Sequence, residues 1–361
     1  HDPNRSRQCS NCEGCEQCCE CWVCDSCGNR YGDDDARCGD CENCENCCSC
    51  NEERTQMPHR RVRRGEYVYH GAPSAKFPRH LGIEIECGLD SDDYSPLRVV
   101  LEEWKAGSHE DGSIGLDNSI EIATAPARGK KVTEQVTDIC TALRKCGAKV
   151  DSSCGLHVHV SVKDLTSKEI LTLVRLYQRV EPALYKVVAP SRRGGNYSKP
   201  WKATFTDGGA LDRSLGVEER IEILEAALYG GADEAKSIKL SPHKHDCRYH
   251  GLNLNALVLY GTVEVRLHQG TVNADKILNW AAACSALVEF AAKNKEQVVV
   301  DMTGTPEEVL HKAVKNKEVV EWLKARRDHF AMSDERRRTR KPAGPVAKHI
   351  LPLEDSEYER S

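Results

Sequence analysis

The segment Cys154-Gly155-Leu156-His157-Val158-His159-Val160-Ser161 (CGLHVHVS) alternates polar and apolar side chains with a period of two residues. This period is typical of a β-strand, in which residues i and i+2 point to the same face of a sheet. The leucine and the two valines would then share one face, and His157, His159 and Ser161 would share the other. The segment therefore predicts a strand with one apolar side and two imidazoles together on its other side.

Four further segments alternate in the same way: GIEIEC (82–87), SIEIATA (119–125), LNLNALVLY (252–260) and TVEVRLH (262–268). Amphipathic helices are predicted between them, over 132–147 with Gly147 at its C-terminus, from a capping box at Thr166 and Glu169, and after Thr271. This mixture predicts an α+β fold, with a largely antiparallel sheet and helices packed on one of its faces.

The polar residues of these strands are unusual in kind. Besides the two histidines, the polar faces would carry Glu84, Glu86, Glu121, Glu264, Arg266 and His268. A half-solvated sheet explains any one strand, but a solvated face usually draws on Lys, Thr, Ser and Gln. Four neighbouring carboxylates repel one another unless a positive charge lies among them. Oxygen ligands with an imidazole suit Mg²⁺ or Mn²⁺, and an arginine can hold a phosphate or a carboxylate through two hydrogen bonds.

The pair His157 and His159 also allows a different site, that of a zinc-dependent hydrolase. Such sites usually continue with Asp and another nearby His, whereas here the pair is followed by Val160-Ser161-Val162-Lys163. The chain also lacks H-E-x-x-H, a P-loop and a G-x-G-x-x-G after a strand. A nucleotide would therefore bind without those loops.

GIEIE, Asp111-Gly112-Ser113-Ile114 before Glu121-Ile122, CGLHVHV and TVEVRLHQGT follow one another in this order. Together they resemble the amidoligase branch of the glutamine synthetase and glutamate–cysteine ligase superfamily, over roughly residues 80–295. The resemblance implies a glutamine-synthetase-like catalytic domain, with its active site on the sheet face opposite the helices.

The resemblance also implies roles for individual residues. Those expected to bind the catalytic divalent ions are Glu84, Glu86, Glu121, His157 and Glu264, with Asp111 as a further candidate. Those expected along the nucleotide are His159, Ser161, Arg266 and Arg248. Arg266 would also hold the transferred phosphate next to Glu264, and Arg192 and Arg193, in SRRGGNYSKP, would lie near phosphate or substrate carboxylate.

The implied activity is that of an ATP-dependent carboxylate–amine ligase that uses Mg²⁺ or Mn²⁺ and passes through an acyl phosphate. The chain has no counterpart of the acidic flap that guards the ammonia site of glutamine synthetase, so we expect a primary amine on a larger molecule as the nucleophile. The substrates could be small molecules, peptides or proteins. A metal-dependent hydrolase built on His157 and His159, and a non-catalytic zinc adaptor, are the alternatives.

The first 50 residues hold 14 of the 20 cysteines, mostly at every third position. Cys24 and Cys27, then Cys38 and Cys41, have the spacing of a structural zinc site. A disulfide knot, an iron–sulfur segment or a metal-buffering segment are the alternatives. Residues 1–54 contain 13 Asp/Glu and 5 Lys/Arg, a net charge of −8. We therefore expect this module to bind a protein partner rather than nucleic acid.

We expect four parts along the chain: a Cys-rich zinc module (1–50), a basic linker (51–78), an amidoligase-like catalytic domain (79–330) and a disordered charged tail (331–361). The net charge of −5 over 361 residues does not call for a nucleic-acid partner. No apolar run has the length of a membrane span, and no signal-peptide core precedes the cysteines. Cytoplasm is the expected compartment.

Overall fold

The computed structural model describes residues 55–63, 66–193, 198–200 and 249–339, together with two short strands near the N-terminus. The chain divides into two compact units, His1–Met57 with Ser91–Ser95, and Pro58–Asp90 with Pro96–Ser361. In the first unit, β1 (Trp22–Val23) and β2 (Arg30–Tyr31) pair in antiparallel fashion. The cysteines of the predicted zinc module lie outside the described residues.

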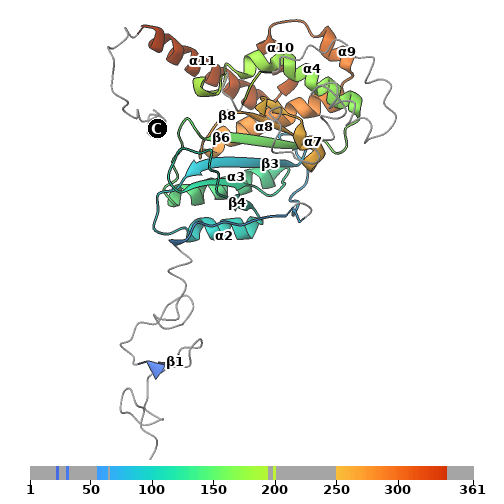
Figure 1. The fold of residues 1–361 in the computed structure, drawn as a ribbon. Coiled ribbons are helices and arrows are strands. Elements are labelled where there is room, and N and C mark those ends of the chain that lie inside the picture. The colour runs from blue at the N-terminus through green and yellow to red at the C-terminus, as the bar shows by residue number, and fades with distance from the viewer. Residues whose placement is uncertain are drawn as a thin grey trace, which may run out of the picture. The chain divides into compact units, whose positions relative to one another are not determined.

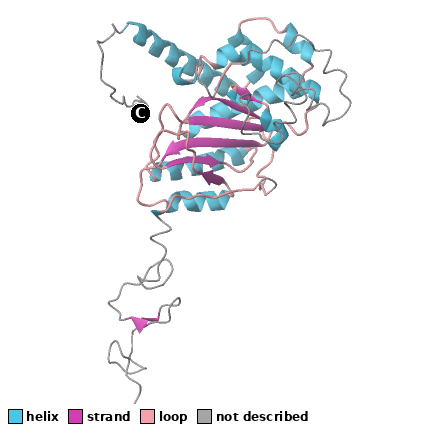
Figure 2. Ribbon diagram, viewed as in Figure 1, coloured by secondary structure: helices cyan, strands magenta, loops and turns pink. Residues whose placement is uncertain are grey.

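The second unit is built on a six-stranded antiparallel sheet in the order β4-β5-β3-β6-β8-β7 (Figure 2). Its strands are β3 (Leu81–Gly88), β4 (Gly107–His109), β5 (Ser119–Ala123), β6 (Gly155–Ser161), β7 (Leu252–Asn253) and β8 (Thr262–Gln269). The strand with the two histidines, β6, lies between β3 and β8. The predicted α+β fold with an antiparallel sheet is therefore confirmed for the described residues.

The register of the central strands places the predicted polar residues side by side. Glu84 lies opposite His157, Glu86 opposite Glu121, and His159 opposite Glu264. Intervening residues of the same strands form the core, and each is at most 3% exposed: Ile83, Ile85, Ile122, Val158 and Val265. Alternation thus separates a charged face from an apolar face across four strands.

One residue predicted on the charged face lies on the apolar face instead. In β8, Val265 pairs with Val158 and His268 pairs with Leu156, so a β-bulge lies between them. The extra residue shifts the alternation by one. His268 is fully buried next to Trp280, with 5.2 Å between the ring centroids. The prediction for His268 is wrong because an alternation with a period of two residues assumes a strand without a bulge.

Helices cover the apolar face (Figure 1). The helix α8 (Ala274–Lys293) contacts β3 and β6, and α3 (Lys130–Lys145) and α4 (Ser167–Leu184) pack against it. Thr166 and Glu169 form the predicted capping box of α4. The other α-helices of the sheet unit are α2 (Ser95–Trp104), α7 (Asn255–Tyr260), α9 (Glu296–Asp301), α10 (Pro306–Val314) and α11 (Lys317–Thr339). None of the described helices is both long and apolar enough to cross a membrane.

The segment 252–260 does not form the continuous strand that its alternation predicts. It forms β7 and then turns directly into α7. The Oδ1 of Asn253 accepts a hydrogen bond from the backbone N–H of Asn255 at 2.9 Å, which starts the turn. Gly261, with φ of 67°, ends the helix. Local hydrogen bonding by an asparagine side chain therefore outweighs the period-two pattern.

Much of the predicted linker belongs to the sheet unit. Residues 58–63 and 66–70, hereafter the strap, lie along the sheet edge. Arg60 and Ser108 exchange backbone hydrogen bonds of 3.0 and 2.8 Å, and the backbone N–H of His70 donates to the carbonyl of Pro126 at 2.9 Å. Phe77 is buried. At the other end, α11 extends past residue 330, where we expected the catalytic domain to end, and residues 340–361 lie outside the described residues.

Candidate active site

Six side chains from four neighbouring strands meet on the charged face of the sheet and form what we call the carboxylate–histidine cluster. Its members are Glu84 and Glu86 from β3, Glu121 from β5, His157 and His159 from β6, and Glu264 from β8. Four of them are at most 8% exposed: Glu86, Glu121, His157 and Glu264. This face is therefore not a solvated exterior.

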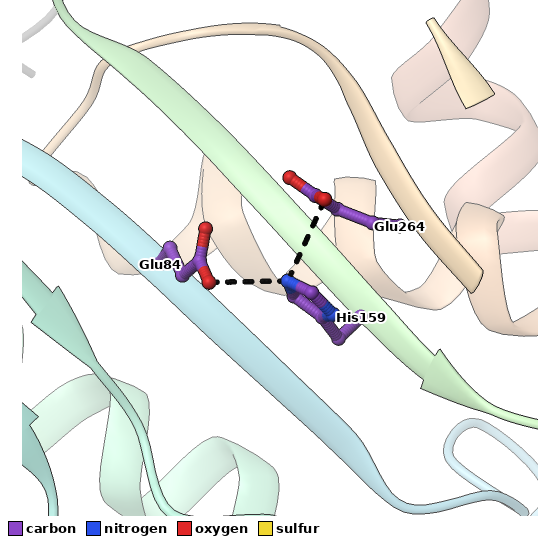
Figure 3. A group of neighbouring side chains, drawn as sticks. All are labelled: Glu84, His159 and Glu264. Carbon is purple, nitrogen blue, oxygen red and sulfur yellow. Dashed lines mark hydrogen bonds and ion pairs between the residues drawn. The ribbon is translucent and has the colours of Figure 1, made fainter. Parts of the chain in front are cut away.

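Glu84 lies between the two histidines. Its Oε2 is 3.0 Å from Nδ1 of His157, and its Oε1 is 3.1 Å from Nε2 of His159. The same Nε2 of His159 is 3.9 Å from Oε2 of Glu264, so His159 connects carboxylates on two strands (Figure 3). Both histidine rings of β6 therefore contact carboxylates of the cluster.

His157 extends the cluster in the other direction. Its Nε2 is 3.4 Å from Oε1 of Glu86, and its Nδ1 is 3.6 Å from Oε1 of Glu264. Glu121 lies further along the sheet, where its Oε1 is 3.4 Å from Nε2 of His109 on β4. The cluster is one connected row across the sheet, because ligand atoms of Glu121, Glu84 and His157 lie within 4.8 Å of one another.

Three overlapping groups in the row offer ligand atoms that lie within 4.8 Å of one another. The groups are Glu84 with His159 and Glu264, Glu84 with Glu121 and His157, and Glu86 with Asp111 and Glu121. Their atoms are mostly carboxylate oxygens, two of the groups add one imidazole nitrogen each, and none of the three includes a cysteine. This donor set fits a hard divalent ion such as Mg²⁺ or Mn²⁺ better than zinc. The sequence placed Asp111 in the site, and the geometry brings it there.

Burial and mutual charge shift the pKa values of the cluster in opposite directions. Burial would raise the pKa of Glu84, but the charges and hydrogen bonds of His159 and His157 hold it well below its usual range. Burial raises the pKa of Glu121 well above its usual range, and repulsion from Glu84 and Glu86 adds to the increase. Burial would lower the pKa of His159, but Glu84 and Glu264 outweigh it and raise the pKa. The row thus has more carboxylate charge than its own cations balance, as expected of a site that binds a further cation.

Two of the predicted arginines lie at one end of the row. The guanidinium of Arg266 pairs with Glu264, and Nη2 of Arg192 donates to the backbone carbonyl of Arg266 at 2.9 Å. Burial would lower the pKa of Arg266, but the charges of Glu264 and Glu84 raise it, so this side chain stays charged. Burial lowers the pKa of Arg192, which is 6% exposed. One buried and one partly buried guanidinium next to the carboxylates make this end suited to a phosphate or a carboxylate.

The structure does not bring Arg193 to the row. Its Nη1 donates to Oδ2 of Asp334 on α11 at 2.5 Å, and its guanidinium lies over the ring of Phe330, 5.5 Å from the centroid. Neighbouring arginines in η1 (Pro190–Arg192) and just after it point to different parts of the fold, which their sequence could not show. Arg248, Cys24, Cys27, Cys38 and Cys41 lie outside the described residues.

Two residues that the sequence did not single out support the row. The Nδ2 of Asn253 donates to Oε2 of Glu264 at 2.6 Å, and Asn253 is buried. The backbone N–H of Gly155 donates to Oε2 of Glu86 at 2.5 Å. A Cβ on Gly155 would lie 2.8 Å from Nε2 of His157 and 3.3 Å from Nη2 of Arg192. The position of Gly155 at the start of GLHVHV could have identified it from the sequence. For Asn253, the sequence indicated only that it belongs to a predicted strand.

A cavity of about 730 Å³ opens next to the other end of the row. Its floor includes Glu84, Glu121 and His159, and Ser161 and Thr262 also line it. The Oγ1 of Thr262 is 3.0 Å from Nδ1 of His159, so this threonine orients the ring that faces the cavity. Ser161, predicted along the nucleotide, is therefore placed at the wall of a ligand-sized cavity.

Comparison with known proteins identifies one protein family whose sequence profile matches this chain. The sequence profile described as "Putative amidoligase enzyme" matches residues 97–288. No curated protein matches the chain significantly. Among solved structures, the complex between the prokaryotic ubiquitin-like protein Pup and its ligase PafA matches with a TM-score of 0.30 and 11% identity, over 73% of this chain and 65% of that one. The chain thus spans less than two thirds of the protein in that structure.

Proposed function

We propose that this chain, which belongs to the amidoligase family, is an ATP-dependent ligase that joins a carboxylate to an amine through an acyl phosphate. The observation that carries the proposal is the row of four carboxylates, three of them buried, and two histidines that ends at Arg266. A zinc hydrolase built on His157 and His159 would rely mainly on imidazole ligands, and a binding module gains nothing from burying carboxylates. Since burial of charged groups lowers stability, this row fits a site that holds ions and polyphosphate.

The proposed reaction has two steps. A carboxylate oxygen of the acid attacks the γ-phosphorus of ATP, and ADP leaves. The amine nitrogen then attacks the acyl carbon, phosphate leaves, and the amine loses a proton. Mg²⁺ or Mn²⁺, held by Glu84, Glu86, Glu121, His157 and Glu264 with Asp111 in support, would neutralise the polyphosphate and the charge that develops during transfer.

The protein's own residues provide position and charge rather than a nucleophile. Arg266 would hold the transferring phosphoryl group, because its guanidinium is partly buried, charged and fixed by Glu264. Arg192 would add a second guanidinium for phosphate or for the carboxylate of the acid. Both groups are held in place by the fold before substrate binds, which is the arrangement that lowers a barrier most effectively.

The nucleotide is proposed to bind in the cavity lined by His159 and Ser161. Along β6, Ser161 lies four residues beyond His157, which is roughly 13 Å at the usual rise of a strand. A nucleotide whose phosphates reach the ions near His157 would therefore extend past Ser161 into the cavity. Arg248 remains a proposed contact, and we do not propose a substrate contact for Arg193.

The experiment that tests the proposal is ATP turnover with pooled amino acids, peptides, proteins and amines, followed by mass spectrometry of the products. An amide product with one ADP released per bond supports it. Zinc-dependent hydrolysis without ATP would replace it with the hydrolase built on His157 and His159. Absence of turnover combined with specific capture of a protein partner would favour the non-catalytic adaptor.

For the N-terminal segment we propose a structural zinc module that recruits a protein partner, with Cys24, Cys27, Cys38 and Cys41 among the ligands. Its sequence has few large apolar residues, so metal binding would have to organise it. We expect at least two zinc ions per chain by elemental analysis. Iron, or no metal after reducing preparation, would contradict this.

The five described cysteines of the sheet unit are free and buried, which agrees with a cytoplasmic protein.

A further inference from the structure

The cavity next to the row has an outer wall made by the strap. From the strap, His59, Val62, Tyr67 and Tyr69 line it, opposite residues of β3, β5 and β6. The strap precedes the part of the chain that matches the amidoligase profile, which begins at residue 97. The family assignment therefore says nothing about this wall.

Aromatic surface is exposed on both sides of the cavity. Tyr69 is 49% exposed and Tyr260 is 39% exposed, although most large hydrophobic side chains of the described residues are buried. Tyr69 contacts the ring of His80 edge to face at 5.0 Å between centroids, and Tyr260 contacts His159 in the same way at 5.8 Å. These contacts hold the tyrosine rings in place, and a planar ligand would gain by covering their exposed aromatic surface.

The charges around the cavity differ between its two ends. At the row, the floor carries the carboxylates of Glu84 and Glu121. Near the strap, the Nζ of Lys163 donates to the hydroxyl of Tyr69 at 3.0 Å and lies 5.3 Å from the centre of its ring. Among the described residues no carboxylate pairs with Lys163, whereas Glu102 pairs with both Arg60 and Lys105. Lys163 thus holds the Tyr69 ring and leaves positive potential at this end.

We infer that the strap forms the base-binding end of the nucleotide site, with Tyr69 as the surface on which the base stacks and Lys163 as the residue that positions Tyr69. This rests on the proposed function, which places the phosphates at the ions of the row. The order along β6 supports it, because His157 lies at the ions, His159 and Ser161 follow along the cavity, and Lys163 comes next to the strap. Stacking of a nucleobase on an aromatic ring is a recurrent and sequence-tolerant mode of binding.

Calorimetry with ADP and with inorganic pyrophosphate, both in the presence of Mg²⁺, tests the inference. The two ligands share a diphosphate, but only ADP has a base. We expect Tyr69→Ala to weaken ADP about tenfold and to leave pyrophosphate unchanged. Tyr69→Phe keeps the ring but loses the hydroxyl that accepts from Lys163, so it should weaken ADP binding less than Tyr69→Ala does. The matched control is Val99→Ala on α2, a 63% exposed residue that is not among those lining the cavity.

Each other outcome has a distinct meaning. If Tyr69→Ala binds ADP as tightly as the unmodified protein, the strap does not contact the base and the inference fails. If the variant loses ADP and pyrophosphate equally, Tyr69 acts on the phosphate end and the inference also fails. If the unmodified protein binds pyrophosphate and ADP equally well, the base has no site at all. If it binds neither ligand, the proposed ATP-dependent function fails along with the inference.

Discussion

The two faces of the central sheet are built from the same strands and differ in nearly every chemical respect. On one face, Ile83, Ile85 and Val158 pack under the helices. On the other, Glu86, His157 and Glu264 are almost equally buried, with exposures of 3% to 5%. Burial stabilises the first set and costs free energy for the second.

The charged face therefore lowers the stability of the fold relative to an apolar face of the same shape. A carboxylate row that repels itself would be replaced by apolar residues if stability were its only purpose. The two faces should therefore respond to mutation in opposite ways. Changes on the charged face should remove activity and leave or improve stability, whereas changes on the apolar face should lower stability and leave chemistry unchanged.

The largest effect is expected from Glu84→Gln and from Glu86→Gln. Each should abolish Mg²⁺-dependent ATP turnover, because a ligand of the proposed ions is lost. Without divalent ions the melting temperature of Glu86→Gln should stay the same or rise, because one of several crowded carboxylates becomes neutral. Glu84→Gln also loses the contacts with His157 and His159, so its melting temperature should not rise. Turnover and thermal unfolding of the same preparations would check both parts.

Binding of the proposed ions can be tested by the melting temperature alone. Added Mg²⁺ should raise the melting temperature of the unmodified protein and raise that of Glu84→Gln much less. The reason is that an ion bound to the native state stabilises it by mass action, and the variant lacks one ligand. Stabilisation by Zn²⁺ but not by Mg²⁺ or Mn²⁺ would contradict the assignment of the donor set.

Arg266→Ala should reduce turnover by about 10²–10³-fold, in the range observed for loss of one group that stabilises a transition state. The same substitution should weaken ATP binding several-fold at most. Arg266→Lys should rescue poorly, because an ammonium is a point charge where a planar fork is needed. Steady-state kinetics together with nucleotide binding would separate the two effects. Unchanged turnover in Arg266→Ala would remove Arg266 from the proposed mechanism.

The β-bulge in β8 turns His268 to the apolar face, where it is fully buried. Burial lowers the pKa of His268 to about 3, with Arg326 adding to the effect. In the unfolded chain its pKa is near 6.5, so the unfolded state gains a proton first as pH falls. The contribution of neutral His268 to stability is therefore complete above about pH 6.5 and declines below it, by up to about 1.4 kcal/mol per pH unit.

His268→Leu should consequently reduce the pH dependence of the unfolding free energy between about pH 6.5 and 4. Denaturant unfolding at several pH values would measure it. All other titratable groups are the same in the two proteins, so the comparison is the difference between the unmodified protein and the variant. Parallel pH profiles for the two proteins would show that His268 is not buried as a neutral ring.

The sequence predicts those features of the fold and the site that depend on residues close together in the chain, and it misses those that depend on contacts between distant segments. The alternation in GIEIE and GLHVHVS is local, and it predicted both the sheet and the shared face of Glu84 and His157. The bulge in β8 depends on pairing with another strand, so His268 was misplaced. The turn at Asn253 depends on a side-chain hydrogen bond that alternation ignores. The strap resembled a linker because its composition is basic and polar, and its contacts come from residues that lie far along the chain, such as Ser108.

The smallest effect is expected at Val265, which lies between Glu264 and Arg266 but faces the core and is 3% exposed. Val265→Ala removes two methyl groups that are buried opposite Val158 and Leu252. It should cost about 1–3 kcal/mol of stability through lost burial and an incompletely filled cavity. At a temperature where the variant is fully folded, its ATP turnover should remain within about threefold of the unmodified value, because a cavity on the apolar face does not alter the charges of the row. A much larger loss of turnover, with the stability change as expected, would mean that packing under β8 sets the position of Arg266, and the two faces would then not be independent.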